Sequence, residues 1–254
     1  MPFRAIQGAE TANFSGFYGS RASRNTCHNV AREAVEVSCA LCETRKEKRF
    51  CPAVHGHICP QCCGEQREIT LDCPSSCVYL QQSRQHEKPR GPGEVSAEAL
   101  FGSVEIGQQF IYEQEHLVLG LSFALTQAAM ADRTLTDSDL IGALSALAKS
   151  YETLVHSGLH YEAPLPGLGQ QAIAGEIQKM VREYRETEQK HMGFVRLRDP
   201  EILRALVFLV RMAYTRTSGR PKSRAFVDFL MQQFPPQQGT ITDPAKSGGS
   251  LILP

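Results

Sequence analysis

Cysteines are crowded into one short stretch of this 254-residue chain, because eight of the nine lie between residues 39 and 77. Cys39 and Cys42 form one C-x2-C pair, and Cys59 and Cys62 form a second. A C-x2-C pair places two thiolates on one side of a metal site, and structural zinc takes four such ligands in a tetrahedral arrangement. The two pairs together therefore predict one zinc site.

The remaining cysteines of the stretch are sufficient for a second ion. They are Cys51, Cys63, Cys73 and Cys77. Eight thiolates for two ions predict two closed structural sites with four ligands each. Which cysteines share which ion stays open at this level. His55 and His57 are alternative ligands, although histidines in turns or on the surface are the commoner case.

The stretch has few large apolar side chains with which to build a core. They are Leu41, Phe50, Val54, Ile58, Ile69 and Leu71. Segments below about 40 residues usually need disulfides or metals to be stable. Zinc contributes on the order of 10 kcal/mol to the folding of such a module. We therefore expect metal, more than apolar packing, to hold this part of the chain together.

The spacing C-x2-C-x8-C-x7-C-x2-C over residues 39–62 resembles the first five ligands of B-box zinc fingers. That resemblance implies two ions in a cross-braced arrangement. The first ion would be held by Cys39, Cys42, Cys59 and Cys62. Cys51 would begin the second site, but Val54 stands where B-boxes usually carry an Asp ligand, which leaves the three later cysteines as replacements. The longer segment at 51–80 is similar to a segment of uncharacterised bacterial proteins, and this likeness implies no activity.

Other cysteine chemistries fit parts of the pattern. Cys-Pro steps and closely spaced cysteines also hold iron–sulfur clusters. A redox or disulfide framework is the third alternative, but disulfides rarely persist in reducing compartments. No secretory signal pattern opens the chain, and the most apolar run is interrupted by Arg204 and Arg211 and is too short to span a bilayer. We therefore expect a cytoplasmic protein without membrane association.

Composition along the chain predicts a small Cys-rich zinc-binding module plus an all-α helical bundle domain. Cys27 lies outside the cluster and is not expected to bind metal. Stretches rich in Gly, Pro and polar residues separate the ordered parts. The predicted parts are a disordered lead-in at 1–34, the module at 35–80, a linker at 81–100, the helical domain at 101–234 and a disordered tail at 235–254.

Apolar residues recur at three- and four-residue steps through the helical domain, which is typical of amphipathic helices. Thr136 and Asp139 form a variant of the capping box at one helix start, and Gly158 suits its end. Asp199 is expected to cap a helix whose wide apolar arc makes it the best candidate for the centre of the domain. Ser223 is expected to cap the last helix. The predicted helices begin near residues 106, 136, 173, 199 and 223.

Two E-x-x-H pairs, at 113–116 and 188–191, have the spacing of carboxylate-bridged di-metal bundles. No helix precedes the first pair to supply the further ligand that such sites need. Exposed helix charges are the default interpretation of both pairs.

Formal net charge is zero, but its distribution is uneven. Residues 98–188 carry 13 acidic and 5 basic residues, whereas residues 196–224 carry 8 basic and 2 acidic residues. The second range contains a basic turn made of Arg216, Arg220, Lys222 and Arg224. Cations beside a helix N-terminus suit an anion, either a partner's carboxylate or phosphate or the acidic part of the same domain. In the module, the basic residues at 45–49 are expected to offset the negative charge of thiolates around zinc.

No Ser-His-Asp arrangement, phosphate-binding glycine loop or HExxH motif occurs in the sequence. We therefore expect a non-catalytic adaptor or regulatory protein whose helical domain binds a protein partner. One alternative is a thiol-based redox or metal sensor in which Cys62 and Cys63 release metal on oxidation. Another is a nucleic-acid-binding regulator, although no aromatic residues for base stacking are interleaved with the basic turn.

Overall fold

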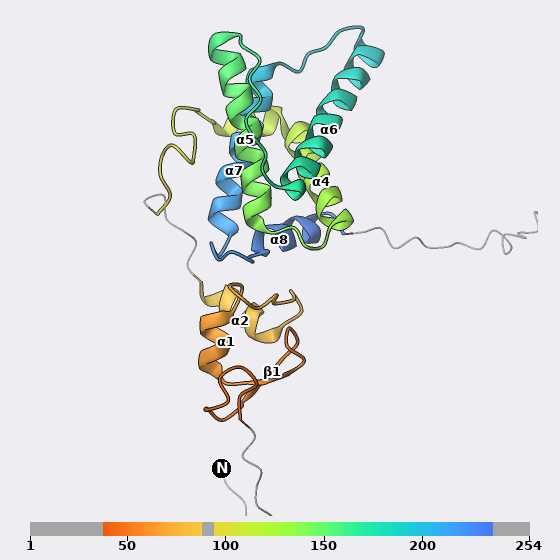
Figure 1. Cartoon of the computed structure of the whole chain (residues 1–254). Coiled ribbons are helices and arrows are strands. Elements are labelled where there is room, and N and C mark those ends of the chain that lie inside the picture. The colour runs from red at the N-terminus through yellow and green to blue at the C-terminus, as the bar shows by residue number, and fades with distance from the viewer. Residues whose placement is uncertain (1–37, 88–93, 236–254) are drawn as a thin grey trace, which may run out of the picture. The chain divides into compact units, whose positions relative to one another are not determined.

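The computed structural model describes residues 38–87 and 94–235 of the chain (Figure 1). The expectations for the lead-in, for Cys27, for the middle of the linker and for the tail beyond residue 235 lie outside these ranges.

Within residues 38–87, the Cys-rich module contains two short strands and two short helices. These are β1 (Arg49–Cys51), β2 (Gly56–Ile58), α1 (Pro60–Gln66) and α2 (Val78–His86). The strands pair antiparallel, with Phe50 opposite His57. Cys59 is the N-cap of α1, and Pro60 follows at the first helical position, where its missing N–H costs nothing. Apart from the cysteines, the fully buried core of this cluster contains only Ile58 and Leu71 among the described residues.

Helix α2 continues to His86 and so enters the segment expected to be a linker. Its first turns bury Leu80, and its last turn carries Arg84, which pairs with Glu68 and Asp228. The helix is short and mostly polar, so it shows little apolar periodicity in the sequence. Its contacts with distant residues explain why a segment with the composition of a linker is helical.

The described part of the helical domain is mostly α-helix. Its helices are α3 (Gln108–Glu113), α4 (Glu115–Ala131), α5 (Asp137–Ser157), α6 (Leu168–Met192), α7 (Asp199–Arg216) and α8 (Ala225–Gln233). The single helix expected from residue 106 is divided at Gln114 into α3 and α4. Within the described ranges, no helix is both long and apolar enough to cross a membrane.

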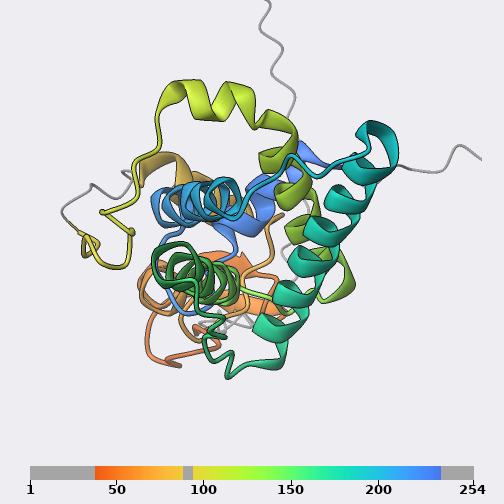
Figure 2. The ribbon, with the colours of Figure 1, turned by 90° about the horizontal axis from the view of Figure 1, so that it is seen from above.

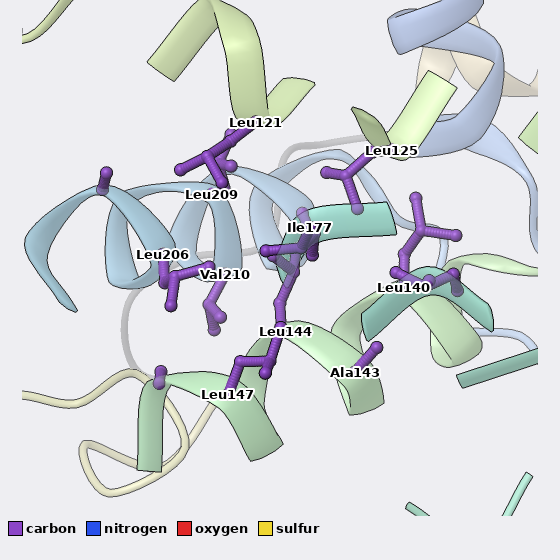
Figure 3. Close-up of a cluster of buried hydrophobic side chains, with 14 of the residues drawn as sticks. Leu121, Leu125, Leu140, Ala143, Leu144, Leu147, Ile177, Leu206, Leu209 and Val210 are labelled. Atoms are coloured by element: carbon purple, nitrogen blue, oxygen red, sulfur yellow. The ribbon is translucent and has the colours of Figure 1, made fainter. Parts of the chain in front are cut away.

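Helix α7 lies against α4, α5 and α8, as its wide apolar arc predicts. In Figures 1 and 2, α5 and α7 run side by side, and α4 and α6 pack against each other. Figure 3 shows apolar side chains from all four helices meeting in one core. The labelled residues include Leu121 and Leu125 of α4, Leu144 and Leu147 of α5, Ile177 of α6, and Leu206, Leu209 and Val210 of α7.

Two local signals at the ends of α5 are confirmed. Thr136 and Asp139 form a capping box, in which the Thr136 backbone N–H donates to Asp139 Oδ2 at 3.0 Å. Gly158 ends the helix with a φ of 70°, a left-handed conformation that favours glycine. These signals depend only on neighbouring residues, which is why they are visible in the sequence.

The expected caps of α7 and α8 differ from the observed ones. Asp199 is the first residue of α7, while Arg198 occupies the N-cap position and its backbone N–H donates to Glu201 Oε2 at 2.8 Å. At α8, Arg224 occupies the N-cap position, and Ser223 Oγ accepts only a long hydrogen bond of 3.5 Å from the backbone N–H of Ala225. The next two amides are satisfied by Asp137 at the start of α5, whose Oδ1 accepts from the backbone N–H groups of residues 226 and 227.

Candidate metal centre

The Sγ atoms of both C-x2-C pairs meet at one point of the module. Those of Cys39, Cys42, Cys59 and Cys62 all lie within 4.8 Å of one another. Thiolates about 2.3 Å from a central tetrahedral zinc ion would be about 3.8 Å apart, so the cluster has the dimensions of a four-thiolate site. All eight cysteines of the stretch are free thiols. Four cysteines thus lie close enough to hold a metal ion, as the spacing predicts.

Local backbone geometry brings the two pairs together. The first pair lies in a turn closed by hydrogen bonds from Cys39 N to Arg45 O and from Glu43 N to Cys39 O, both of 2.8 Å. The second pair lies at the start of α1. There Cys59 N donates to Cys39 Sγ at 3.1 Å, and Cys62 N donates to Cys59 Sγ at 3.4 Å. Backbone donors directed at sulfur favour thiolates, so the donor set fits a divalent cation.

One cation of the basic run faces the cluster directly. Arg45 Nη1 lies 3.8 Å from the Sγ atoms of both Cys59 and Cys62. The hydrogen bond to Cys59 is the largest cause of a raised pKa of the Arg45 guanidinium. Arg49 instead lies over the ring of Tyr79, at 4.6 Å from its centroid. Arg45 therefore offsets the negative charge of the thiolates, as expected for part of the run.

Three of the four thiols have shifted pKa values. Hydrogen bonds from the Thr44 side chain, followed by those from the backbone of Thr44 and Arg45, lower the pKa of Cys42 to about 5. The backbone N–H of Cys62 lowers the pKa of Cys59. The hydrogen bond between Cys62 and Cys59, together with burial, raises the pKa of Cys62 to about 12. The metal-free cluster thus combines readily formed thiolates with a thiol that stays protonated, and a metal must displace that proton.

The second set of cysteines is less tightly gathered. Among the described residues, no further group of three or more Cys, His, Asp or Glu ligand atoms lies within 4.8 Å of one another. Burial raises the pKa of Cys73, and the nearby Cys51 and Cys77 raise it further. Cys63 Sγ accepts a hydrogen bond from Arg67 Nη2 at 3.7 Å. A second ion at these four cysteines stays a prediction.

Neither of the two candidate histidine ligands, His55 and His57, belongs to the four-cysteine cluster. The His57 ring packs edge-on against Phe50, with 5.5 Å between ring centroids, and His55 has a positive φ of 50°. Both side chains are exposed.

Both E-x-x-H pairs line one cavity of about 900 Å³ bordered by α3, α4, α6 and α7. Glu188 has a structural task there, because its Oε2 accepts from the backbone N–H groups of Arg196 and Leu197 at 3.0 and 2.9 Å. The ligand atoms of the two pairs do not form a compact metal-sized group among the described residues. These observations favour the default interpretation of surface charges.

Two cations of the basic turn contact the module. Arg220 Nη1 donates to the carbonyl oxygens of Gly64 and Arg67 at 3.2 and 2.7 Å. Lys222 Nζ donates to the Thr70 carbonyl at 2.9 Å and forms an ion pair of the same length with Asp72. Within the chain, these two cations therefore bind the end of α1 and the segment that follows it.

The other two cations of the turn contact the helical domain itself. Arg216 lies over the ring of Phe229, at 4.1 Å from its centroid. Arg224 donates to the carbonyl oxygens of Arg133 and Leu135. Binding of a partner's anion by this turn stays a prediction.

Glu68 makes several contacts in this region that could not be predicted from the neighbouring sequence. Its side chain is only 1% exposed, and its φ is +52°. Glu68 Oε1 accepts from Arg84 Nη2 at 2.9 Å, and Oε2 accepts from Ser218 Oγ at 2.8 Å. Arg84 also pairs with Asp228 of α8 at 2.6 Å. No local spacing marks Glu68, because its partners lie far away in the chain.

Comparison with known proteins gives no match: no family model, no curated protein and no solved structure is significantly similar to this chain. Function is therefore inferred from the cysteine cluster and from the contacts around it.

Proposed function

We propose that this protein is a non-catalytic, zinc-dependent adaptor or regulator, in which a structural metal module is joined to a helical domain that binds a protein partner. The observation that carries the proposal is the cluster formed by Cys39, Cys42, Cys59 and Cys62. Four thiolates complete the coordination of a structural zinc ion and leave no open position for a substrate. Three of these cysteines are buried, which suits a closed site.

The proposal places one zinc ion on this cluster and a second on Cys51, Cys63, Cys73 and Cys77. Elemental analysis of protein purified without added metal should give about two zinc ions per chain, since each structural ion takes four ligands. Cys39→Ser should reduce the zinc content, whereas Cys27→Ser should leave it unchanged. Detection of iron and acid-labile sulfide, together with visible charge-transfer absorption, would instead show that the cysteines hold an iron–sulfur cluster.

Exposed apolar side chains on α3 and α4 support the partner-binding part of the proposal. Tyr112 is 81% exposed, and Leu119 and Phe123 are 44% and 47% exposed. Leu119 and Phe123 lie four residues apart and so share one face of α4, and exposed apolar side chains that lie together are typical of protein-binding sites. Leu119→Gln combined with Tyr112→Ser should abolish capture of the partner without changing the melting temperature or the zinc content. The matched control is Leu168→Gln at the start of α6, an equally apolar residue that is 83% exposed.

Cys42 favours a second candidate function, that of a redox-sensitive metal switch. It is the only partly exposed member of the cluster, and its pKa is lowered to about 5. Accessible thiolates of low pKa are the ones that peroxide oxidises. Peroxide would oxidise two thiols to a disulfide and would itself be reduced to water. Because a disulfide does not bind zinc in place of two thiolates, zinc would then be released. Zinc release at peroxide doses that oxidise known sensor thiols would support the switch, and retention of zinc would support the adaptor.

A further inference from the structure

The segment that follows the metal-binding end of α1 docks on the helical domain. We call residues 64–72 the docking segment and residues 217–224 the receiving loop. Lys222 N donates to Glu68 O at 2.8 Å, and Ser218 Oγ donates to the Glu68 carboxylate. Arg220 and the Lys222 side chain add bonds to carbonyl oxygens of the docking segment. With the ion pair between Lys222 and Asp72, six polar contacts therefore join two parts of the chain about 150 residues apart.

The docking segment is directly connected to two members of the cysteine cluster. Cys59 caps α1 and Cys62 lies in its first turn, whereas Gly64 and Arg67 at its other end accept the bonds from Arg220. The helix has only seven residues, and isolated helices shorter than about 12–15 residues are marginal in water. Metal bound to Cys59 and Cys62 would supply the anchoring that this helix lacks.

Glu68 makes the docking geometry demanding. A left-handed φ is unfavourable for a residue with a side chain, and a buried carboxylate is tolerated only when it is paired and hydrogen-bonded. Arg84 and Ser218 both supply these bonds. If the docking segment loses its conformation, Glu68 cannot keep both partners, because one lies in α2 and the other in the receiving loop.

We infer that metal binding at the four-cysteine cluster and docking of residues 64–72 on residues 217–224 are coupled. The helical domain thereby responds to the metal state of the module. This inference rests on the proposed metal site and adds to it the route by which metal affects the helical domain. Coupling is reciprocal: if metal favours docking, then docking must increase the affinity for metal by the same factor. A change in the receiving loop, which supplies none of the four clustered cysteines, should therefore weaken metal binding.

Arg220→Ala in the full-length chain tests this reciprocity. It removes two bonds to the docking segment and touches none of the four cysteines. Competition with a chromogenic zinc chelator should show weaker zinc binding by a factor of about 5–150, the usual range for coupled sites. Arg224→Ala is the matched control, since it removes the same charge from the same loop but loses only bonds to Arg133 O and Leu135 O within the helical domain. Its zinc affinity should equal that of the wild type.

Hydrogen exchange gives a second, independent measurement. The Lys222 amide, which donates to Glu68 O, should be protected in the zinc-loaded wild-type chain and should lose protection when zinc is removed. If Arg220→Ala fails to fold, Ser218→Ala, which removes one bond to Glu68, tests the same step with a smaller change.

The outcomes separate the inference from the proposed function. Zinc affinity unchanged by Arg220→Ala, or weakened equally by Arg224→Ala, would overturn the coupling while the metal site stands. Equal protection of the Lys222 amide with and without zinc would also overturn the coupling without affecting the proposed metal site. A wild-type chain that binds no metal at all would instead overturn the proposed function.

Discussion

The Asp137 carboxylate lies at the N-terminus of α8 and accepts a hydrogen bond from the backbone N–H of Phe226 at 3.0 Å. The same Oδ1 accepts from Val227 N at 3.1 Å, and Oδ2 accepts from Ser223 Oγ at 2.7 Å. Asp137 is itself the first residue of α5 and is only 1% exposed. One buried carboxylate therefore complements the positive end of α8 and fixes it to the start of α5.

Asp137→Ala should destabilise the helical domain strongly. It leaves two amides of α8 and the Ser223 hydroxyl without their charged acceptor, and bonds to a charged group contribute about 1.5–3 kcal/mol each. Because such terms are not additive, we expect a loss of about 3 kcal/mol in the free energy of unfolding. Urea denaturation followed by circular dichroism measures it.

The control for this change is Asp139→Ala, two residues away on the same helix. It removes only the capping box with Thr136, and loss of an N-terminal cap costs about 1 kcal/mol. If both variants lost the same stability, the contact between Asp137 and α8 would not have the importance that its geometry indicates.

Arg45→Ala should weaken zinc binding without changing the set of ligands. The guanidinium contacts two thiolates of the cluster at 3.8 Å, and loss of such outer partners typically costs about 10–100-fold in metal affinity. Competition with a chelator measures the change. Lys46→Ala removes an adjacent exposed cation and should leave the affinity unchanged, so equal effects of both variants would indicate only a general effect of charge.

Cys42 should react before Cys62 in the metal-free, reduced protein near neutral pH. Its pKa of about 5 keeps it a thiolate there, and the thiolate is the nucleophile. Iodoacetamide labelling followed by mass spectrometry should find Cys42 modified before Cys62, whose pKa is raised to about 12. Thr44→Val removes the largest cause of the lowered pKa of Cys42 and should slow its labelling. Simultaneous modification of both cysteines would contradict this order.

The lowered pKa of Cys42 also gives the metal-free chain a pH-dependent stability. A folded-state pKa below the unfolded value of about 9 contributes stability that is fully present above that value. This contribution is lost as the pH falls through about 5. The difference in melting temperature between wild type and Cys42→Ser should therefore become smaller as the pH is lowered over that interval. An unchanged difference would show that the thiolate does not stabilise the fold.

Zinc uptake should release protons at neutral pH. Cys62 is protonated in the metal-free cluster because the hydrogen bond with Cys59 and burial raise its pKa to about 12, and only the thiolate binds metal. A weakly buffered solution with a pH indicator should acidify when zinc is added, and the affinity should fall as the pH is lowered. Uptake without acidification would mean that Cys62 is not a ligand.

Local patterns in the sequence were sufficient to predict several features. The two C-x2-C pairs specify the four-cysteine cluster, because a knuckle of four residues places both of its sulfurs by itself. Thr136, Asp139 and Gly158 mark the ends of α5 for the same reason. Amphipathic periodicity predicts helices, since a face that recurs every 3.6 residues must be buried as a unit.

Only the tertiary structure decided which polar groups meet. Asp137 serves α8 rather than its own helix, and Arg220 contacts Arg67 O, 153 residues earlier in the chain. Residues 81–86 of α2 are predicted as linker, yet the helix extends through them to where Arg84 pairs with Glu68 and Asp228. A charged side chain acquires its partner when two distant surfaces come together, and its own neighbours in the chain do not specify that partner. For this reason the sequence does not identify Glu68, whereas it does identify the cysteines, which lie three positions apart in each knuckle.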